Sequence, residues 1–280
     1  MRVNVGDIGL WFDVEGSGLV VDDNAMRERP TVVLLHGGPG FDHSLFKPEY
    51  AALADVAQVV YLDHRGNGRS DRGDPADWRL DVWADDVRAF CDALGIEHPI
   101  VLGWSFGGMV AMAYAARHPD HPAKVILQST AARMDIDRVT EAFRRVGGDE
   151  AADAARAFWS EGASPEAGAA YVQICLPVYG ANTPDPSTMG RSQMNVELLM
   201  DPGRVMREMN LLPGLAAVQC PTLVLAGEDD PICPIEAMEV IVDALPADLV
   251  RFERFPKAGH FLNLDDPDRF FGLVRDFIAE

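Results

Sequence analysis

The chain has 280 residues, of which 48% are hydrophobic and 24% charged, a balance typical of a soluble globular protein. Its formal net charge of −20 would repel a phosphate backbone, which excludes DNA and RNA as partners. We find neither a signal peptide nor an apolar run of about 18 residues, so we expect a cytoplasmic protein that does not bind a membrane.

The N-terminal third of the chain predicts strands and a glycine-rich loop. Residues 1–16 alternate apolar and polar side chains, and residues 31–36 form a short branched apolar run. This run leads into His36–Gly40, "HGGPG", where the glycines allow close approach of a ligand and the proline fixes the turn. An oxyanion requires backbone N–H donors, and we assign one to Gly38. We interpret His36 as a hydrogen-bonded structural histidine.

The next elements continue a strand and helix alternation. Residues 46–55 are helix-like, 56–63 predict a strand and 79–95 a helix. Between the last two lies Asp63–Ser70, "DHRGNGRS", which we interpret as a rigid structural loop whose arginines pair with nearby acids. Repeated alternation of this kind predicts a mostly parallel sheet with helices on both faces.

A serine stands where the following strand, 99–104, turns into a helix over 106–119. Gly103 and Gly107 flank Ser105 at two residues on either side, which spells G-x-S-x-G. In this motif a sharp turn exposes the serine oxygen above the sheet, with the dipole of the next helix pointing at it. The alternative is a glycine-rich connection that carries a serine by chance.

A helical insertion interrupts the alternation after the strand at 124–130. Residues 131–218 contain alanine-, methionine- and arginine-rich helical stretches and no good strand. The alternation resumes with strands at 221–227 and 249–256, a helix at 235–245 and a closing helix at 266–280. We therefore predict a catalytic domain of residues 1–130 and 219–280 and a helical cap of residues 131–218.

The loops after the last two strands supply an acid and a base. Reactive groups collect beyond the carboxyl ends of parallel strands, which places Asp230 and His260 at the same edge of the sheet as Ser105. Serine needs a base to take its proton and an acid to orient that base. We assign these roles to His260 and Asp230, with Asp229 as a competitor for the acid and Glu228 as a weaker one. Phe106, the residue after the nucleophile, supplies the second oxyanion donor.

Other chemistries lack their motifs. The histidines do not have the spacing of a metal hydrolase, and no phosphate-binding or dinucleotide-binding glycine pattern occurs. We expect neither a metal nor another cofactor. The four cysteines form no C-x-x-C pair, so we expect reduced structural thiols.

Five segments together resemble a known family. "LLHGGPG", "LDHRGNGRS", "GWSFGG", "GEDDPICP" and "AGH" occur in this order around the helical insertion, and the chain thereby resembles the α/β-hydrolase superfamily. Within it the chain is similar to the proline iminopeptidase-like branch, which also contains esterases and N-acyl-homoserine lactonases. The resemblance implies an α/β-hydrolase fold, the catalytic roles assigned above, a cap that shapes the pocket and a small acyl substrate. We expect a monomer or a small homo-oligomer.

Departures from the family pattern concern the substrate. Proline iminopeptidases usually read "HGGPGGG" and "DQRG" and carry a W-x-x-W-E stretch that grips an amino terminus, whereas this chain reads "HGGPGFDH", "DHRG" and "FWSEG". Glu161 and Glu197 are the remaining candidates for an amine anchor, although each also suits a solvated helix surface. We therefore rank ester or lactone hydrolysis first, an iminopeptidase second and a non-catalytic ligand sensor third.

The cap composition suggests an apolar pocket. Methionine and leucine side chains are frequent in its second half and would suit an acyl chain if they face inward, although they are equally suited to ordinary core. The residues concerned are Met189, Met194, Leu198, Leu199, Met200, Met206 and Met209. As substrate-binding residues we predict Phe41, Trp104, Tyr171 and Glu197.

Overall fold

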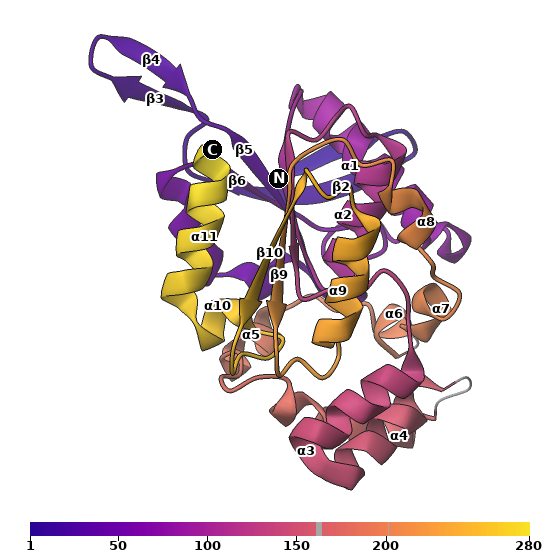
Figure 1. Ribbon diagram of the computed structural model, residues 1–280. Helices are drawn as coiled ribbons and strands as arrows, with labels where there is room; N and C mark the ends of the chain where they lie inside the picture. Colours follow the sequence, from indigo (N-terminus) through magenta and orange to yellow (C-terminus); the bar gives the residue numbers. More distant parts are fainter. Residues whose placement is uncertain (161–163, 201) are drawn as a thin grey trace.

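The computed structural model describes residues 1–160, 164–200 and 202–280, and its centre is an eight-stranded sheet (Figure 1). The strand order is β1-β2-β6-β5-β7-β8-β9-β10. The strands from β6 to β10 in this order pair in parallel, while β1 and β2 are antiparallel additions at one edge. The bounds are Arg2–Val5 (β1), Ile8–Glu15 (β2), Thr31–Leu35 (β5), Gln58–Leu62 (β6), Ile100–Trp104 (β7), Lys124–Gln128 (β8), Thr222–Gly227 (β9) and Val250–Phe255 (β10). The predicted mostly parallel sheet is confirmed.

Side chains of the central strands alternate between two apolar layers. In β5, Val33 and Leu35 belong to the layer that contains the helices α1, α2 and α9, while Val32 and Leu34 face the layer that contains α11, η1 and η2. This alternation follows from the two-residue period of a strand. The helices are Leu80–Leu94 (α1), Phe106–Arg117 (α2), Ile235–Ala244 (α9) and Pro267–Ala279 (α11), with 3-10 helices at His43–Phe46 (η1), Glu49–Asp55 (η2) and Pro75–Asp77 (η3) and a short helix at Leu262–Asp265 (α10). Both faces of the sheet are therefore covered.

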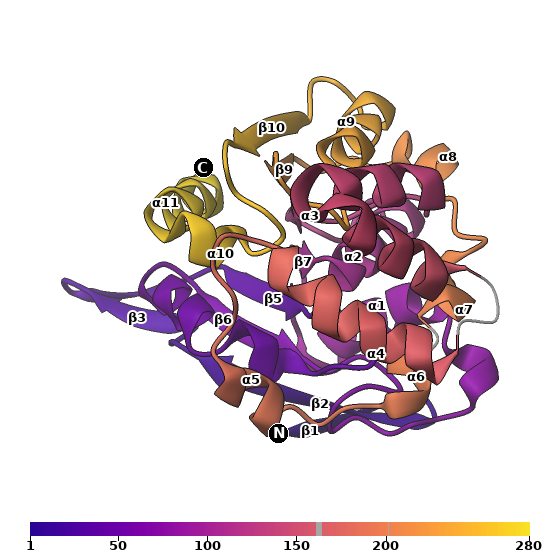
Figure 2. The same ribbon diagram turned by 90° about the horizontal axis from the view of Figure 1, so that it is seen from below.

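The segment between β8 and β9 lies over the carboxyl ends of the strands (Figure 2). Its helices are Ile136–Trp159 (α3), Pro165–Ile174 (α4), Leu176–Val178 (η4), Pro186–Arg191 (α5), Val196–Met200 (α6), Gly203–Met206 (α7) and Leu212–Leu215 (α8). Gly148, with φ of 76°, breaks α3 into two helical runs. The two ends of the segment meet, because Leu211 N–H donates to the Ala132 carbonyl at 2.8 Å and Arg133 bridges Asn210. We refer to this segment as the cap.

A two-stranded hairpin that the sequence did not predict projects from the body (Figure 1). It consists of Leu19–Asp22 (β3) and Ala25–Glu28 (β4), paired in antiparallel fashion. Leu19, Val21 and Met26 are at least half exposed. Because the hairpin has no buried face, it lacks the apolar alternation from which a strand is recognised.

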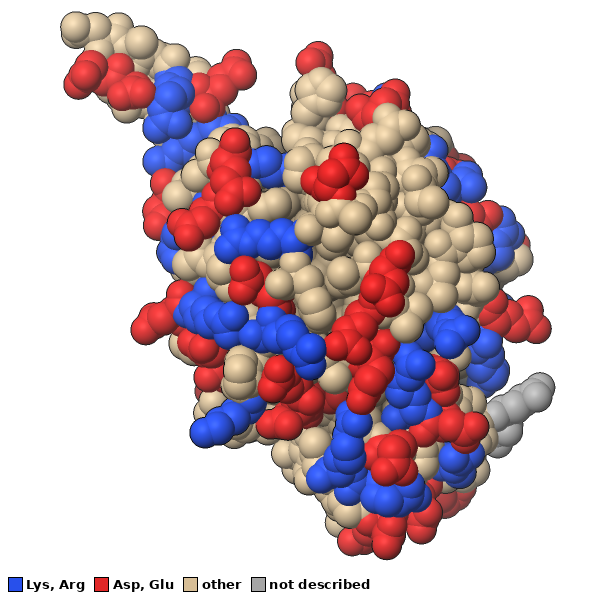
Figure 3. Space-filling view, in the orientation of Figure 1, with Lys and Arg blue, Asp and Glu red and all other residues tan. Residues whose placement is uncertain are grey.

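Acidic and basic side chains are mixed on the face shown in Figure 3. Arg145 of α3, in the cap, pairs with Glu236 of α9, while outside the cap Arg254 of β10 pairs with Glu239 of α9. The four cysteines are free and buried. Among the described residues, no helix is long and apolar enough to cross a membrane.

Candidate active site

Ser105 occupies a strained turn between β7 and α2. Its backbone has φ of 56° and ψ of −118°, a region that residues with a Cβ rarely adopt. The turn depends on the flanking glycines. A Cβ atom at Gly107 would lie 1.8 Å from the Leu35 carbonyl oxygen, and one at Gly103 would lie 2.3 Å from the Gly107 carbonyl oxygen. The G-x-S-x-G pattern is therefore a steric requirement of this turn.

β8 and the residues directly after it hold the backbone of Ser105 by two hydrogen bonds. Its N–H donates to the Gln128 carbonyl at 3.0 Å, and the Thr130 hydroxyl donates to its carbonyl oxygen at 2.7 Å. Ser105 itself remains half-buried. A strained backbone persists only where surrounding contacts fix it, and such strain gathers at functional sites.

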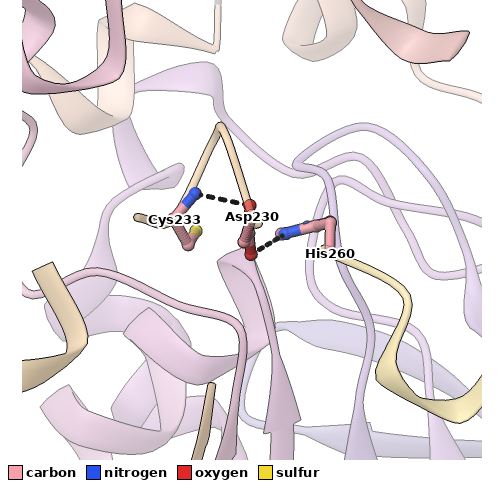
Figure 4. A group of neighbouring side chains, drawn as sticks. All are labelled: Asp230, Cys233 and His260. Atoms are coloured by element: carbon pink, nitrogen blue, oxygen red, sulfur yellow. Dashed lines mark hydrogen bonds and ion pairs between the residues drawn. The ribbon is translucent and has the colours of Figure 1, made fainter. Parts of the chain in front are cut away.

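Asp230 and His260 form a buried hydrogen-bonded pair (Figure 4). His260 Nδ1 lies 2.8 Å from Asp230 Oδ2, while Asp230 Oδ1 accepts the N–H groups of Ile232 and Cys233 at 2.9 Å each. Asp229 is exposed instead. The structure thus brings Asp230, and not Asp229, to His260, and it leaves Nε2 of the imidazole available for a second partner.

Residues from distant parts of the chain fix the position of His260. Its N–H donates to the Tyr179 carbonyl at 2.6 Å, and Trp104 Nε1 donates to its carbonyl oxygen at 3.3 Å. The Tyr179 ring packs edge-on against the imidazole, with centroids 5.4 Å apart. Trp104 precedes Ser105, so this contact links the loop of the base to the turn of the serine. Sequence reasoning missed Tyr179, which follows "LPV" in the cap and carries no motif.

His36 orients the peptide that contains the predicted Gly38 donor. Its Nδ1 lies 2.8 Å from the Gly37 carbonyl oxygen, and its Nε2 lies 3.3 Å from the backbone N–H of His64. A carbonyl can only accept and an N–H can only donate, so the proton is on Nδ1. Burial lowers the pKa of His36 and favours this neutral form. In a trans peptide the C=O and N–H point in opposite directions, so fixing the Gly37 carbonyl also fixes the direction of the Gly38 N–H.

The two predicted oxyanion donors lie beside the serine turn. A Cβ atom at Gly37 would lie 3.5 Å from the Ser105 Cβ, which brings the "HGGPG" loop against the serine. Phe106 is the first residue of α2, and the first N–H groups of a helix have no partner within it. Its amide is therefore available to an external acceptor, in a position where the helix dipole favours negative charge.

The "DHRGNGRS" loop is held by ion pairs and hydrogen bonds. Arg65 makes a bidentate pair with Asp86 at 2.8 Å, and Arg69 pairs with Asp42 at 2.6 Å. Asp63 accepts from the His43 ring at 2.7 Å. The arginines of this loop pair with acids, and the loop is a rigid support beside the "HGGPG" segment.

Predicted substrate-binding residues lie in different environments. Phe41 is half-buried, and its ring is 3.5 Å from where a Cβ of Gly38 would lie. Trp104 is buried against Phe46 and His260, in the apolar layer between the sheet and α11. Tyr171 is buried in the cap, where its hydroxyl meets that of Tyr179 at 2.5 Å. Tyr171 is thus connected to the imidazole through Tyr179.

The two candidates for an amine anchor are Glu197 and Glu161. Glu197 is exposed on α6 and pairs with Arg204 at 3.4 Å, an arrangement of a solvated helix surface. Glu161 lies outside the described residues.

The apolar residues of the cap divide into two sets. Met206, Met209 and Leu198 are buried in the main core, whereas Met189, Met194 and Met200 are about 40% exposed. The methionines therefore do not form one continuous pocket lining, and part of the set is ordinary core.

Two buried groups of the described residues have the side chains that metals use. They are Asp230, Cys233 and His260, and Asp42, His43 and Asp63, each with its donor atoms within 4.8 Å of one another. In both groups the imidazole and a carboxylate already bond to each other. Burial raises the pKa of the Cys233 thiol well above its usual range, so this thiol is protonated and a poor ligand. We assign both groups to hydrogen-bonding networks.

Comparisons with known proteins agree with the fold. Residues 30–156 and 144–267 match the family described as alpha/beta hydrolase fold. The chain is 29% identical to the AB hydrolase superfamily protein YisY of Bacillus subtilis, over 88% of this chain and 90% of that protein. The crystal structure of a proline iminopeptidase from Mycobacterium smegmatis is 27% identical, covers 100% of this chain and 97% of its own, and superposes with a TM-score of 0.76. A thermophilic esterase from Thermogutta terrifontis, also 27% identical, covers 100% and 98% with a TM-score of 0.65.

Proposed function

We propose, from the premise that the chain belongs to the α/β-hydrolase fold family, that it is a serine hydrolase that cleaves a carboxylic ester or a lactone without a cofactor. The observation that carries the proposal is the His260 and Asp230 pair, whose 2.8 Å bond leaves Nε2 of the imidazole free. Trp104, which contacts His260, directly precedes Ser105 at its strained turn. This combination suits a hydroxyl nucleophile with a positioned base.

The reaction proceeds in two acyl transfers. Ser105 Oγ attacks the substrate carbonyl while His260 Nε2 takes its proton, and Asp230 stabilises the imidazolium through Nδ1–H. The N–H groups of Gly38 and Phe106 stabilise the oxyanion of the tetrahedral intermediate. Collapse of this intermediate breaks the bond between the carbonyl carbon and the leaving oxygen, which takes the proton from His260, and an acyl-enzyme remains. The leaving group departs as an alcohol from an ester and stays on the acyl chain as a hydroxyl from a lactone. A water molecule activated by His260 then releases the acid.

The environment of Glu197 supports an ester or a lactone over a peptide. Recognition of a free amino terminus calls for an acid that faces the substrate, and Glu197 is exposed and paired with Arg204. Proline iminopeptidase activity is the second candidate, favoured by the TM-score of 0.76 with the Mycobacterium smegmatis enzyme.

Side-by-side assays of the purified chain test the proposal. We expect turnover of nitrophenyl esters or an acyl-homoserine lactone, loss of several orders of magnitude in Ser105→Ala, and no effect of a chelator. Loss of activity with the chelator would contradict the serine mechanism. A higher kcat/KM for prolyl naphthylamide than for every ester would favour the iminopeptidase, and no turnover of any acyl substrate would favour a ligand sensor.

A further inference from the structure

Gly40, the last residue of the "HGGPG" loop, is held from two sides. Its N–H donates to the Asn67 Oδ1 at 2.6 Å, and its carbonyl oxygen accepts the N–H of Asn195, in the cap, at 2.7 Å. The contact is close, because a Cβ atom at Gly40 would lie 2.8 Å from the Leu199 nitrogen and 2.9 Å from the Asn195 carbonyl oxygen. The "HGGPG" loop and the cap therefore contact each other through their backbones.

Asn67 holds Gly40 from the side of the catalytic domain. Its side chain is fully buried, and besides accepting from Gly40 it donates through Nδ2 to the Arg65 carbonyl at 2.8 Å. Both ends of the amide are thus engaged, and Arg65 is itself anchored by Asp86. Asn67 has no freedom to follow a displaced Gly40.

Asn195 holds Gly40 from the side of the cap. Its buried side chain donates through Nδ2 to the Gly66 carbonyl at 2.8 Å, and its Oδ1 accepts the N–H of Glu197 at 3.1 Å in the first turn of α6. One side chain thus fastens the cap to the "DHRGNGRS" loop and caps a helix. The bond to Gly66 sets where the backbone N–H of Asn195 meets Gly40.

We propose that Asn67 and Asn195 are positioning residues that act through Gly40 to place the Gly38 N–H for the oxyanion. The inference rests on the proposed function, and it makes the cap a contributor to the rate as well as to substrate choice. Gly38 and Gly40 are separated by one residue, so a shift of Gly40 moves the donor. A misplacement of about 1 Å at such a site can lower the rate by about 100-fold.

Asn195→Asp separates the positioning role from the helix cap. Aspartate keeps an acceptor for the Glu197 N–H and is a good helix cap, but it cannot donate to the Gly66 carbonyl. We expect kcat to fall by about 10- to 100-fold, equally for short and long nitrophenyl esters, with KM unchanged within about twofold. Affinity for an alkyl boronic acid, which forms a tetrahedral adduct with the serine, should fall in parallel, and Asn67→Ala should behave in the same way.

Ser192→Ala is the matched control. It removes a contact of 2.7 Å between the hydroxyls of Ser192 and Ser44, which also joins the cap to the catalytic domain but does not touch Gly40. We expect its kcat to stay within about twofold of the unmodified chain. Thermal unfolding of each variant reports whether the fold is kept.

Hydrogen exchange of the Gly40 amide, which donates to Asn67, reports without turnover whether Gly40 is held in place. We expect faster exchange of this amide in Asn195→Asp and no change in Ser192→Ala. An Asn195→Asp chain with unchanged exchange and kcat, or with changes only in KM and chain-length preference, would overturn the inference. If the unmodified chain hydrolyses neither an ester nor a lactone, the proposed function fails, whereas the exchange comparison still decides whether the cap holds the loop.

Discussion

Asp230→Asn should abolish most of the activity while leaving the fold intact. The carboxylate has two different tasks, because Oδ1 accepts two backbone N–H groups from Ile232 and Cys233 and Oδ2 accepts from His260 Nδ1. Asparagine satisfies only one of them. With its oxygen toward the N–H groups of Ile232 and Cys233, the asparagine keeps two hydrogen bonds, each worth about 1 kcal/mol. The flipped amide would instead place its own NH₂ group against these two N–H donors and lose both bonds. Its NH₂ group is therefore presented to His260.

The consequence for the imidazole is the wrong tautomer. Nδ1 must then accept a hydrogen bond, so the proton moves to Nε2, and that nitrogen can no longer take the proton of Ser105. We expect kcat/KM to fall by about 10³- to 10⁴-fold, which corresponds to about 4 to 5.5 kcal/mol of transition-state stabilisation. The free energy of unfolding should change by no more than about 1 kcal/mol, because both backbone contacts persist.

Nitrophenyl ester kinetics and urea unfolding of Asp230→Asn and Asp229→Asn provide the measurement. Asp229 is exposed, so its variant should stay within about tenfold of the unmodified chain. A larger loss in Asp229→Asn than in Asp230→Asn would refute the reasoning and transfer the acid role to Asp229.

Other outcomes follow from burial and close approach. Gly107→Ala should prevent folding or lower the free energy of unfolding by more than about 4 kcal/mol, since its Cβ would lie 1.8 Å from the Leu35 carbonyl oxygen; a thermal unfolding midpoint like that of the unmodified chain would contradict this. Burial lowers the pKa of His36 and of His64, so between about pH 6.5 and these lowered values the unfolded chain binds protons that the folded chain does not. The free energy of unfolding should therefore fall with falling pH in that window, by up to about 1.4 kcal/mol per pH unit for each histidine, and urea titrations that give a constant value from pH 7 to 5 would disprove it. Tyr179→Ala should lower kcat, because it removes the ring that packs against the imidazole of His260, and equal kcat in stopped assays of both chains would show that the ring is dispensable.

The sheet and the serine turn could be predicted because they are encoded locally. A run of branched residues such as Ile100–Leu102 has few alternatives to a buried strand, and the G-x-S-x-G pattern stands in five consecutive residues. The clash that Gly103 avoids lies inside this turn, whereas the clash that Gly107 avoids is with Leu35 of β5. The order of strands then indicated which loops share an edge. Residue types and topology together were sufficient to select Asp230 and His260 as candidates.

Contacts made by tertiary packing could not be predicted. Tyr179 lies 81 residues before His260 and reaches it only because the cap folds over the strand ends, and nothing in "LPVY" signals this. Asn67 and Asn195 bind backbone groups, which have no sequence signature. The hairpin of β3 and β4 has no buried face, so burial imposes no alternation of apolar and polar side chains on its strands.

The joined ends of the cap have a consequence for how such proteins diversify. Because Ala132 and Leu211 meet through a backbone hydrogen bond, a segment of different length or sequence can be spliced between them without moving β8 or β9. Loop closure would cost little, since doubling the length of a flexible segment adds only about 0.6 kcal/mol. The contact at Gly40 limits which cap segments can be transplanted, because a new segment must also supply a backbone N–H that donates to the Gly40 carbonyl. We expect chimaeras that retain Tyr179 and residues 192–195 to accept new substrates at undiminished rates, and chimaeras that replace residues 192–195 to be slow with every substrate.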